Sequence, residues 1–294
     1  MGAWYDEILM EFRENKGSIY AILVLLFVTI GIWYAVLLEN PNRELTVAFL
    51  DIGQGDAIYI EAPNGNQALI DGGNGKTVLA ALGEVMPLYD RSIDVVIGTH
   101  PDQDHIGGLP FVLEKYEVGT FFDPGVQKKL GSYDALLSAV REKHVTYVHA
   151  RRGQKIILDD GVFLTILFPD RNLPFVETNT ASIVAKLSYG KTSFLFTGDS
   201  PKNIEHYLIT LDAAALDTDV LKVGHHGSHT SSGEKFLKAV SPTIAAISAG
   251  KNNRYGHPHK EVLAGLAAIG ANVLKTYERG TIVLFSDGSK IGLK

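Results

Sequence analysis

The chain of 294 residues contains no cysteine. This absence excludes disulfide bonds, a zinc site built from thiolates and a cysteine nucleophile. It does not fix the compartment, because both cytosolic and exported proteins can lack cysteine. An excess of positive charge is also missing, since the formal net charge is −6. No global field therefore attracts nucleic acid, and any contact with DNA would depend on a local basic patch.

One long hydrophobic run occurs near the N-terminus. Residues 18–38 carry no charge and consist mainly of Ile, Leu, Val, Phe and Ala. At about 1.5 Å per residue, a helix of this length crosses a hydrocarbon layer roughly 30 Å thick. A cleaved signal peptide is the alternative, but the run is long for one and no clear cleavage site follows it. We therefore predict a cytoplasmic stub over residues 1–17, an uncleaved transmembrane anchor over 18–38 and a linker over 39–44.

The charges beside this run bear on its orientation. Arg13 and Lys16 precede it and Arg43 follows it. Cytoplasmic flanks of membrane spans are enriched in Lys and Arg, so the count favours, by one charge, an N-terminus inside the cell. The prediction is a single-pass protein of the cell membrane whose globular domain is extracellular.

From residue 45 onward, short apolar runs are broken by Gly, Asn and Asp, a pattern typical of strands and helices joined by tight turns. Strand-rich blocks separated by alternating helices and strands predict a mixed α/β sandwich with helices outside two sheets. The predicted strands cover residues 45–50, 57–61, 67–70, 93–98, 118–122, 145–148, 155–158, 162–168, 182–188, 193–197, 220–223, 243–248, 272–276 and 281–285. The predicted helices cover residues 76–89, 106–116, 133–143, 203–211, 234–240 and 260–269.

The sequence THPDQDHIGG, residues 99–108, directly follows an apolar run that predicts a buried strand. His100, Asp102, Asp104 and His105 are released at the end of that strand, within reach of a common point. Imidazole and carboxylate groups gathered in this way are typical ligands of a divalent metal ion. The alternative is a solvated turn ahead of a helix, with Asp104 or Thr99 as the N-cap.

Three further predicted strands also end in polar groups. Asp71 and Asp199 each follow an apolar run, and the alternatives are an ordinary Asp-Gly turn for Asp71 and a helix N-cap for Asp199. His225 and His226 follow another such run, and adjacent histidines after a buried strand are unusual. Because alternation along a strand sends neighbouring side chains to opposite faces, we expect one histidine to bind metal and the other to bind substrate or to pack. We favour His225 as the ligand.

Residues 99–108 resemble the second motif of the metallo-β-lactamase superfamily, normally His-x-His-x-Asp-His, with Asp102 at the position of the second histidine. This variant resembles the extracellular nuclease domain of the ComEC-type competence proteins. The resemblance implies a four-layer αββα sandwich over residues 45–294, with the metal site at one edge. The transmembrane helix predicted over residues 18–38 precedes it. ComEC-type channels carry many membrane spans and this chain has one, so a DNA-uptake channel would be a separate protein.

The resemblance also implies roles for single residues. Asp71 would support the ligands from behind, and Asp199 would bridge two metal ions. The third-motif histidine of the superfamily is absent; residues 177–182, ETNTAS, stand there and resemble the Asn-x-x-Ser pattern of ComEC-type domains, which implies Asn179 and Ser182 as substrate-binding residues. The implied ligands are His100, Asp102 and Asp199 for the first ion, and Asp104, His105, Asp199 and His225 for the second.

The implied cofactors are two divalent metal ions. An oxygen-rich first site shifts the preference from zinc toward manganese or magnesium, so we expect manganese or zinc, with magnesium as an alternative. Two ions roughly 3.5 to 4 Å apart lower the pKa of a bridging water and stabilise a departing alkoxide, which is the chemistry of phosphodiester hydrolysis. Asp104, Asp199 and His226 are the candidate catalytic residues, with Asp104 or Asp199 accepting the proton of that water.

Residues 51–56, DIGQGD, carry glycines but lack the lysine and the following helix of a phosphate-binding P-loop. They resemble the Asp-x-Gly-Gln-Gly-Asp signature of the ComEC-type domain. The resemblance implies that Gln54 and Asp56 line the site, with Asp56 behind the metal ligands. The alternative is a tight turn between two strands.

Residues 248–260 concentrate cations, amides and an aromatic ring after a predicted strand, a combination that suits phosphates and a stacked base. ComEC-type domains have a similar Asn-x-Tyr-x-His-Pro stretch, which implies Asn253, Tyr255 and His257 as substrate-binding residues. Lys251 and Arg254 would then contact phosphates. The alternative is a solvated polar loop.

Taken together, these motifs predict a membrane-anchored, metal-dependent hydrolase, a phosphodiesterase or nuclease that acts on DNA outside the cytoplasmic membrane. The negative net charge opposes DNA binding, and the basic loop offsets it only in part. The same centre could hydrolyse a phosphocholine ester, another phosphodiester or a lactone. A hypothesis of a different class is a non-catalytic, metal-binding module that docks a competence or secretion partner, but retention of Asp199 speaks against it.

Overall fold

The computed structural model describes residues 16–38, 44–87 and 89–294, which belong to two units that we treat separately. In the first unit, helix α2 (Lys16–Leu38) is long and apolar enough to cross a membrane. It contains the predicted span over residues 18–38. Of the predicted stub, only residues 16 and 17 are described, and they are helical. Of the predicted linker, only Glu44 is described, at the start of the second unit.

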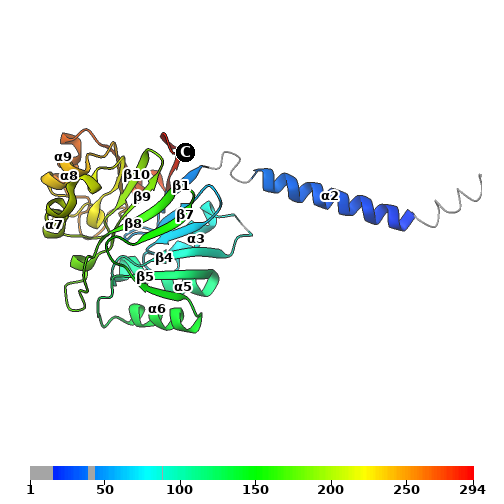
Figure 1. The fold of residues 1–294 in the computed structure, drawn as a ribbon, viewed down its shortest axis with the longest axis horizontal. Helices are drawn as coiled ribbons and strands as arrows, with labels where there is room; N and C mark the ends of the chain where they lie inside the picture. The colour runs from blue at the N-terminus through cyan, green and yellow to red at the C-terminus, as the bar shows by residue number, and fades with distance from the viewer. Residues whose placement is uncertain (1–15, 39–43, 88) are drawn as a thin grey trace, which may run out of the picture. The chain divides into compact units, whose positions relative to one another are not determined.

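The second unit contains two mixed sheets (Figure 1). The first sheet has eight strands in the order β15-β14-β1-β2-β3-β4-β5-β6, and its strands from β3 to β6 are parallel. Its strands are β1 (Leu45–Phe49), β2 (Ile58–Glu61), β3 (Gln67–Ile70), β4 (Ser92–Ile97), β5 (Glu117–Asp123), β6 (Thr146–His149), β14 (Ile282–Ser286) and β15 (Ile291–Leu293).

The second sheet has seven strands in the order β13-β12-β11-β10-β9-β8-β7, and its strands from β10 to β13 are parallel. The remaining pairs of this sheet are antiparallel. Its strands are β7 (Lys155–Asp159), β8 (Val162–Phe168), β9 (Val184–Tyr189), β10 (Thr192–Phe196), β11 (Val220–Lys222), β12 (Ile244–Ile247) and β13 (Asn272–Lys275).

Helices cover the outer face of each sheet (Figure 1). Helices α3 (Thr77–Val85), α5 (Leu109–Lys115) and α6 (Gly131–Glu142) pack on the first sheet, and α7 (Lys202–Asp212), α8 (Glu234–Val240) and α9 (Lys260–Ala268) pack on the second. The predicted four-layer αββα order is therefore confirmed. The short elements are α4 (Gln103–Ile106), α10 (Thr276–Arg279), η1 (Asn179–Ala181), η2 (Ala213–Leu216) and η3 (Gly224–Gly227).

The apolar runs of the sequence reflect strands that are buried on both faces. In β1, Val47 and Phe49 face the core between the two sheets, whereas Ala48 faces the core beneath the helices. β4 repeats the pattern, with Ile97 in the first core and Val96 in the second. Strands covered on both sides have no polar face, and this is why they appear as continuous hydrophobic runs.

Some predicted boundaries were wrong for local reasons. The helix expected over 76–89 ends at Val85, because the residue before Pro87 is extended, as proline demands. The helix expected over 106–116 is two helices, α4 and α5, that meet at Gly107 and Gly108. A Cβ at Gly108 would lie 2.0 Å from the carbonyl oxygen of Gly72, so only glycine fits between the helices. The short elements β15 and α10 were not predicted.

The core between the two sheets should dominate the stability of the second unit. Phe196 in β10 is buried, and its ring lies 6.3 Å from that of Phe49 across the sandwich. Phe196→Ala should lower the free energy of unfolding by about 3–5 kcal/mol, the usual cost of removing a buried aromatic ring. Ile157→Ala on β7, where the side chain is 75% exposed, should change it by less than about 0.5 kcal/mol. Urea unfolding followed by circular dichroism measures both, and equal effects would contradict the assignment of the core.

Candidate metal centre

The chemically reactive side chains come from loops at the carboxyl ends of parallel strands. Asp71 follows β3, the loop of residues 99–105 follows β4, and Asp199 follows β10. The two adjacent histidines follow β11, and the basic loop follows β12. Because parallel neighbours end on the same side, β3 and β4 bring their loops to one edge of the first sheet, and β10, β11 and β12 do so in the second. The sandwich joins the two edges into one site.

Asp199 lies at the centre of this site and is buried. Its Oδ1 lies 3.3 Å from His105 Nε2. Its Oδ2 lies 3.5 Å from His225 Nε2, 3.8 Å from His226 Nε2 and 3.9 Å from His100 Nε2. One carboxylate is therefore surrounded by four imidazole nitrogens from two loops.

Most of these facing atoms lack a hydrogen-bond partner in the described part of the chain. They are His100 Nε2, His105 Nε2, His226 Nε2 and Asp199 Oδ1, all buried. Such orphaned atoms are costly unless a ligand binds them. Two groups, His100 with His105 and Asp199, and Asp104 with His105 and His226, each place three ligand atoms within 4.8 Å of one another. The donor set fits divalent metal ions.

Asp71 orients the ligands from behind, where its carboxylate is buried. It accepts hydrogen bonds from the backbone N–H and the hydroxyl of Thr99, each at 2.7 Å, and lies 2.8 Å from His105 Nδ1. A proton on Nδ1 satisfies the carboxylate and leaves Nε2 facing Asp199, which is the usual arrangement behind a metal-binding histidine.

His226 is oriented in the same way. Its Nδ1 lies 3.0 Å from the carbonyl oxygen of Ser248, which can only accept, so Nδ1 carries a proton. The carboxylate of Asp56 lies 3.3 Å from the same nitrogen. His226 Nε2 consequently faces the centre, 3.4 Å from Asp104 Oδ2.

Lys222 is a buried cation of the site that the sequence reasoning missed. Its ammonium group donates a hydrogen bond of 2.7 Å to Asp56 Oδ2. A lysine inside the apolar run of β11 is the signal that could have revealed it, because a buried lysine almost always has a partner. Gly55 allows this segment to pack closely against the backbone of Asp104. A Cβ at Gly55 would lie 2.2 Å from the backbone oxygen of Asp104, which accepts a hydrogen bond from the Asp56 N–H.

The carboxylate of Asp102 is shared between the centre and a lysine. Its Oδ2 lies 3.9 Å from His100 Nε2, while its Oδ1 accepts a hydrogen bond from the ammonium group of Lys128. Lys128 was also missed by the sequence reasoning. The side chains of both residues are about one-third exposed, at 29% for Asp102 and 34% for Lys128.

The prediction that His225 and His226 point to opposite faces was wrong. Both lie in the short helix η3 with φ of 49° and 55°, so strand alternation does not apply to them. Their rings are 6.0 Å apart and both Nε2 atoms approach Asp199. They differ in exposure, since the side chain of His225 is 25% exposed and that of His226 is buried.

Electrostatics favours ionised carboxylates in this centre. Burial raises the pKa of Asp199, but the charges of His105 and His226 outweigh it and hold that pKa well below its usual range. Burial opposes charge on His226 as well, yet Asp199 and Asp56 raise its pKa to about 9. Burial raises the pKa of Asp104, and the hydrogen bond from His226 lowers it to about 2 overall. A cation is therefore favoured beside these carboxylates.

A cavity of about 470 Å³ opens beside Asp104. Arg254 and Tyr255 lie in its wall, with the guanidinium 4.8 Å from the ring centroid of Tyr255, and the ring of Tyr255 stacks on His257. This cation and these rings are what the sequence predicted for a loop that contacts phosphates and bases. The cavity is lined by Gln54, Asn74, Gln103, Asp104, Asn253, Arg254 and Tyr255.

Other predicted substrate residues make internal contacts. The Asn253 side chain donates to the carbonyl oxygens of Gly250 and His257, so it shapes the basic loop. Ser182 is fully buried and its hydroxyl accepts a hydrogen bond from the Asp199 N–H. Asn179 Oδ1 is buried, with no partner among the described residues, and Lys251 is exposed outside the cavity lining.

A buried carboxylate anchors the loop that follows the two histidines. Glu205, in α7, accepts hydrogen bonds from the backbone N–H groups of Ser232 and Gly233. Burial raises the pKa of Glu205 from 4.5 to about 7, and the two hydrogen bonds oppose this shift. The folded chain therefore holds a proton on Glu205 more tightly than the unfolded chain does.

This pKa gives the stability a predictable pH dependence. The contribution of Glu205 should be most favourable below its unfolded pKa of 4.5 and should be lost as the pH rises through about 7. Relative to Glu205→Gln, the wild type should lose about 2 kcal/mol of unfolding free energy between pH 5 and pH 8. Urea unfolding of both proteins at pH 5, 6.5 and 8 tests this, because other groups titrate alike in the two. A difference that does not vary with pH would contradict it.

A family model described as the metallo-beta-lactamase superfamily matches residues 50–251. The chain belongs to the metallo-β-lactamase superfamily. The solved metallo-beta-lactamase fold protein YhfI of Bacillus subtilis shares this fold, with a TM-score of 0.57 at 12% sequence identity, over 82% of this chain and 100% of that one.

Curated relatives of this member of the superfamily are of the competence type. ComE operon protein 3 of Bacillus subtilis (strain 168) is 35% identical over 93% of this chain and 36% of its own length. Competence protein ComA of Neisseria gonorrhoeae is 30% identical over 82% of this chain and 32% of its own length. The chain thus spans about a third of the length of these relatives. The expected resemblance to competence proteins is confirmed.

Proposed function

We propose that this protein is a membrane-anchored, metal-dependent phosphodiesterase that cleaves DNA. One observation carries the proposal: the buried, unpartnered atoms of three histidines and of Asp199 converge on one space. The cavity beside Asp104, with Arg254 and Tyr255 in its wall, supports a phosphodiester substrate. The competence-type relatives support DNA as that substrate.

His100, Asp102 and Asp199 would hold a first divalent ion, and Asp104, His105 and Asp199 a second. For the adjacent histidines, the geometry supports His226 as the metal ligand, whereas the sequence had favoured His225. His226 is buried with a backbone carbonyl fixing its Nδ1 proton, so we assign it as the ligand. His225 is partly exposed and holds Thr230 through Nδ1, so we assign it to the substrate phosphate.

Two divalent ions bound there would supply positive charge that polarises the phosphate and acidifies a water molecule, with manganese or zinc as the first candidates. The chain's own groups provide the proton transfer and the orientation. Asp104, in the cavity wall, would take the proton of the attacking water. Arg254 would neutralise a neighbouring phosphate, and Tyr255 would stack a base.

We infer that α2 is the membrane anchor and that the catalytic unit lies outside the cell, on the charge count of its flanks. We propose a DNA-uptake channel as its partner. The same centre also suits a phosphocholine ester or a lactone. The alternative of a non-catalytic, metal-binding docking module needs no substrate groups, so the cavity beside Asp104, with Arg254 and Tyr255 in its wall, speaks against it.

The first test is hydrolysis by the full chain in detergent. After treatment with EDTA and addition of Mn²⁺, Zn²⁺ or Mg²⁺, the protein should cleave bis(p-nitrophenyl) phosphate and DNA. Asp199→Asn should abolish both activities, because it removes the carboxylate shared by the ligand groups. Asp71→Asn, which loosens His105 from behind, should reduce them about 10- to 100-fold. Asp160→Asn, an exposed turn residue, is the matched control.

The outcomes separate the hypotheses. Cleavage of the small diester without cleavage of DNA would retain the hydrolase and exclude DNA as substrate. No turnover with any of the three metals would reject the enzyme and favour the docking module.

A further inference from the structure

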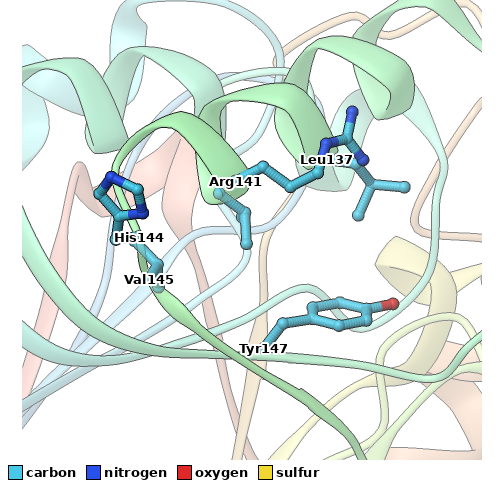
Figure 2. Close-up of a pocket in the computed structure, with 6 residues that line it drawn as sticks. Leu137, Arg141, His144, Val145 and Tyr147 are labelled. Atoms are coloured by element: carbon cyan, nitrogen blue, oxygen red, sulfur yellow. The ribbon is translucent and has the colours of Figure 1, made fainter.

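Two adjacent cavities lie along the exposed edge of the first sheet, on the side of β6. One, of about 390 Å³, is formed by the end of α6 and by β6 (Figure 2). Figure 2 shows the side chains of Arg141 and Leu137 on one side of it and Tyr147 on the other. The other, of about 520 Å³, extends toward the loop of residues 125–129. Leu137 and Tyr147 line both cavities, so the two adjoin, and together we call them the trough.

Cations gather along this trough. Lys128 and Lys129 line the larger cavity and Arg141 lines the smaller one, and the imidazoles of His149 and His144 lie beside them. Asp134 is the exposed carboxylate of the lining, while Asp123 is buried and accepts hydrogen bonds from the hydroxyls of Tyr133 and Tyr147. Cations outnumber carboxylates in a chain whose net charge is −6, so the trough is a local basic patch.

Aromatic rings are interleaved with these cations. Phe175 is 84% exposed, and Tyr147 is 39% exposed with its ring perpendicular to that of His149. Exposed aromatic rings beside cations offer surfaces on which bases can stack. The Phe175 segment is fixed beside the cationic loop, because the Gln127 N–H donates to the carbonyl oxygen of Pro174.

The trough reaches the metal centre through Lys128. Its ammonium group lines the larger cavity and binds Asp102, whose other oxygen faces His100. The cavity with Arg254 and Tyr255 meets the same loop at Asp104. Two patches of cations and aromatic rings therefore adjoin the metal centre. The trough contacts the loop of residues 99–105 at Asp102, and the cavity with Arg254 and Tyr255 contacts it at Asp104.

We propose that this trough, defined by Lys128, Lys129, Arg141, Tyr147, His149 and Phe175, binds a single-stranded stretch of nucleic acid whose scissile phosphate lies at the metal centre. The inference rests on the proposed function and names its substrate class. Phosphates would meet the cations, and bases would stack on Phe175 and Tyr147. Bases in a duplex have both faces covered by their neighbours, so the rings of the trough select a single strand.

Binding without cleavage tests the trough directly. Fluorescence anisotropy would follow a fluorescein-labelled 20-mer of thymidine, and the same length of duplex, with the full chain in detergent and EDTA. Phe175→Ala should weaken binding of the single strand about fivefold or more, because stacking on one ring is worth about 1–3 kcal/mol per base. Tyr89→Ala is the matched control, since Tyr89 is a 68% exposed aromatic residue ahead of β4, at the opposite end from the metal loop.

Salt dependence tests the cations. The double variant Lys129→Ala with Arg141→Ala should flatten the slope of log K against log salt by about 1.4, at about 0.7 for each lost phosphate contact. Lys235→Ala, an exposed lysine on α8, should leave the slope unchanged. Metal-dependent hydrolysis of bis(p-nitrophenyl) phosphate should be unaffected by all of these variants, because a small diester does not reach the trough.

Each result bears on one proposal alone. If Phe175→Ala and the double variant bind the single strand as the wild type does, or if the wild type does not bind it, the trough is not a nucleic-acid site, whatever the hydrolase activity. Equal weakening of duplex and single strand would overturn the single-strand assignment. If the trough variants weaken binding but the wild type does not hydrolyse the small diester, the trough is supported and the hydrolase is rejected.

Discussion

The site depends on one buried carboxylate, Asp199, held among four imidazole rings. An isolated charge at this depth would cost many kcal/mol, and the surrounding nitrogens offset that cost only if positive charge is present. In the chain alone, His105 and His226 supply it, because their pKa values are raised. Divalent ions would supply the same charge and would displace those protons. The geometry of the cluster therefore fits a metal centre.

The rest of the sandwich holds these groups in place. Parallel strands deliver Asp71 and His105 from the first sheet, and Asp199 and His226 from the second. Asp71 orients His105, and the Ser248 carbonyl orients His226. Between the sheets, the ammonium group of Lys222 neutralises the carboxylate of Asp56. Each orienting group is itself buried and hydrogen-bonded, so the ligands have little freedom to relax away from one another.

The sequence was informative where function depends on strand ends. Apolar runs located β3, β4, β10 and β11, and the polar residues after them were correctly expected to meet. It failed where the backbone departs from strand or helix geometry, as at His225, whose positive φ turns both histidines inward. It also failed for long side chains that cross the fold: Lys128 reaches Asp102 from a loop 26 residues away, and no local pattern encodes that pairing. Burial of Ser182 likewise depends on a segment 17 residues away, because its hydroxyl accepts a hydrogen bond from the Asp199 N–H after β10.

The most direct measurement is a count of bound metal ions. Metal-free full-length protein would be titrated with Mn²⁺, with free ion quantified by electron paramagnetic resonance. The account predicts two bound ions per chain with a spin-coupled spectrum, because Asp199 is shared by both. Binding that is absent, or that persists unchanged when Asp199 is replaced by alanine, would contradict it.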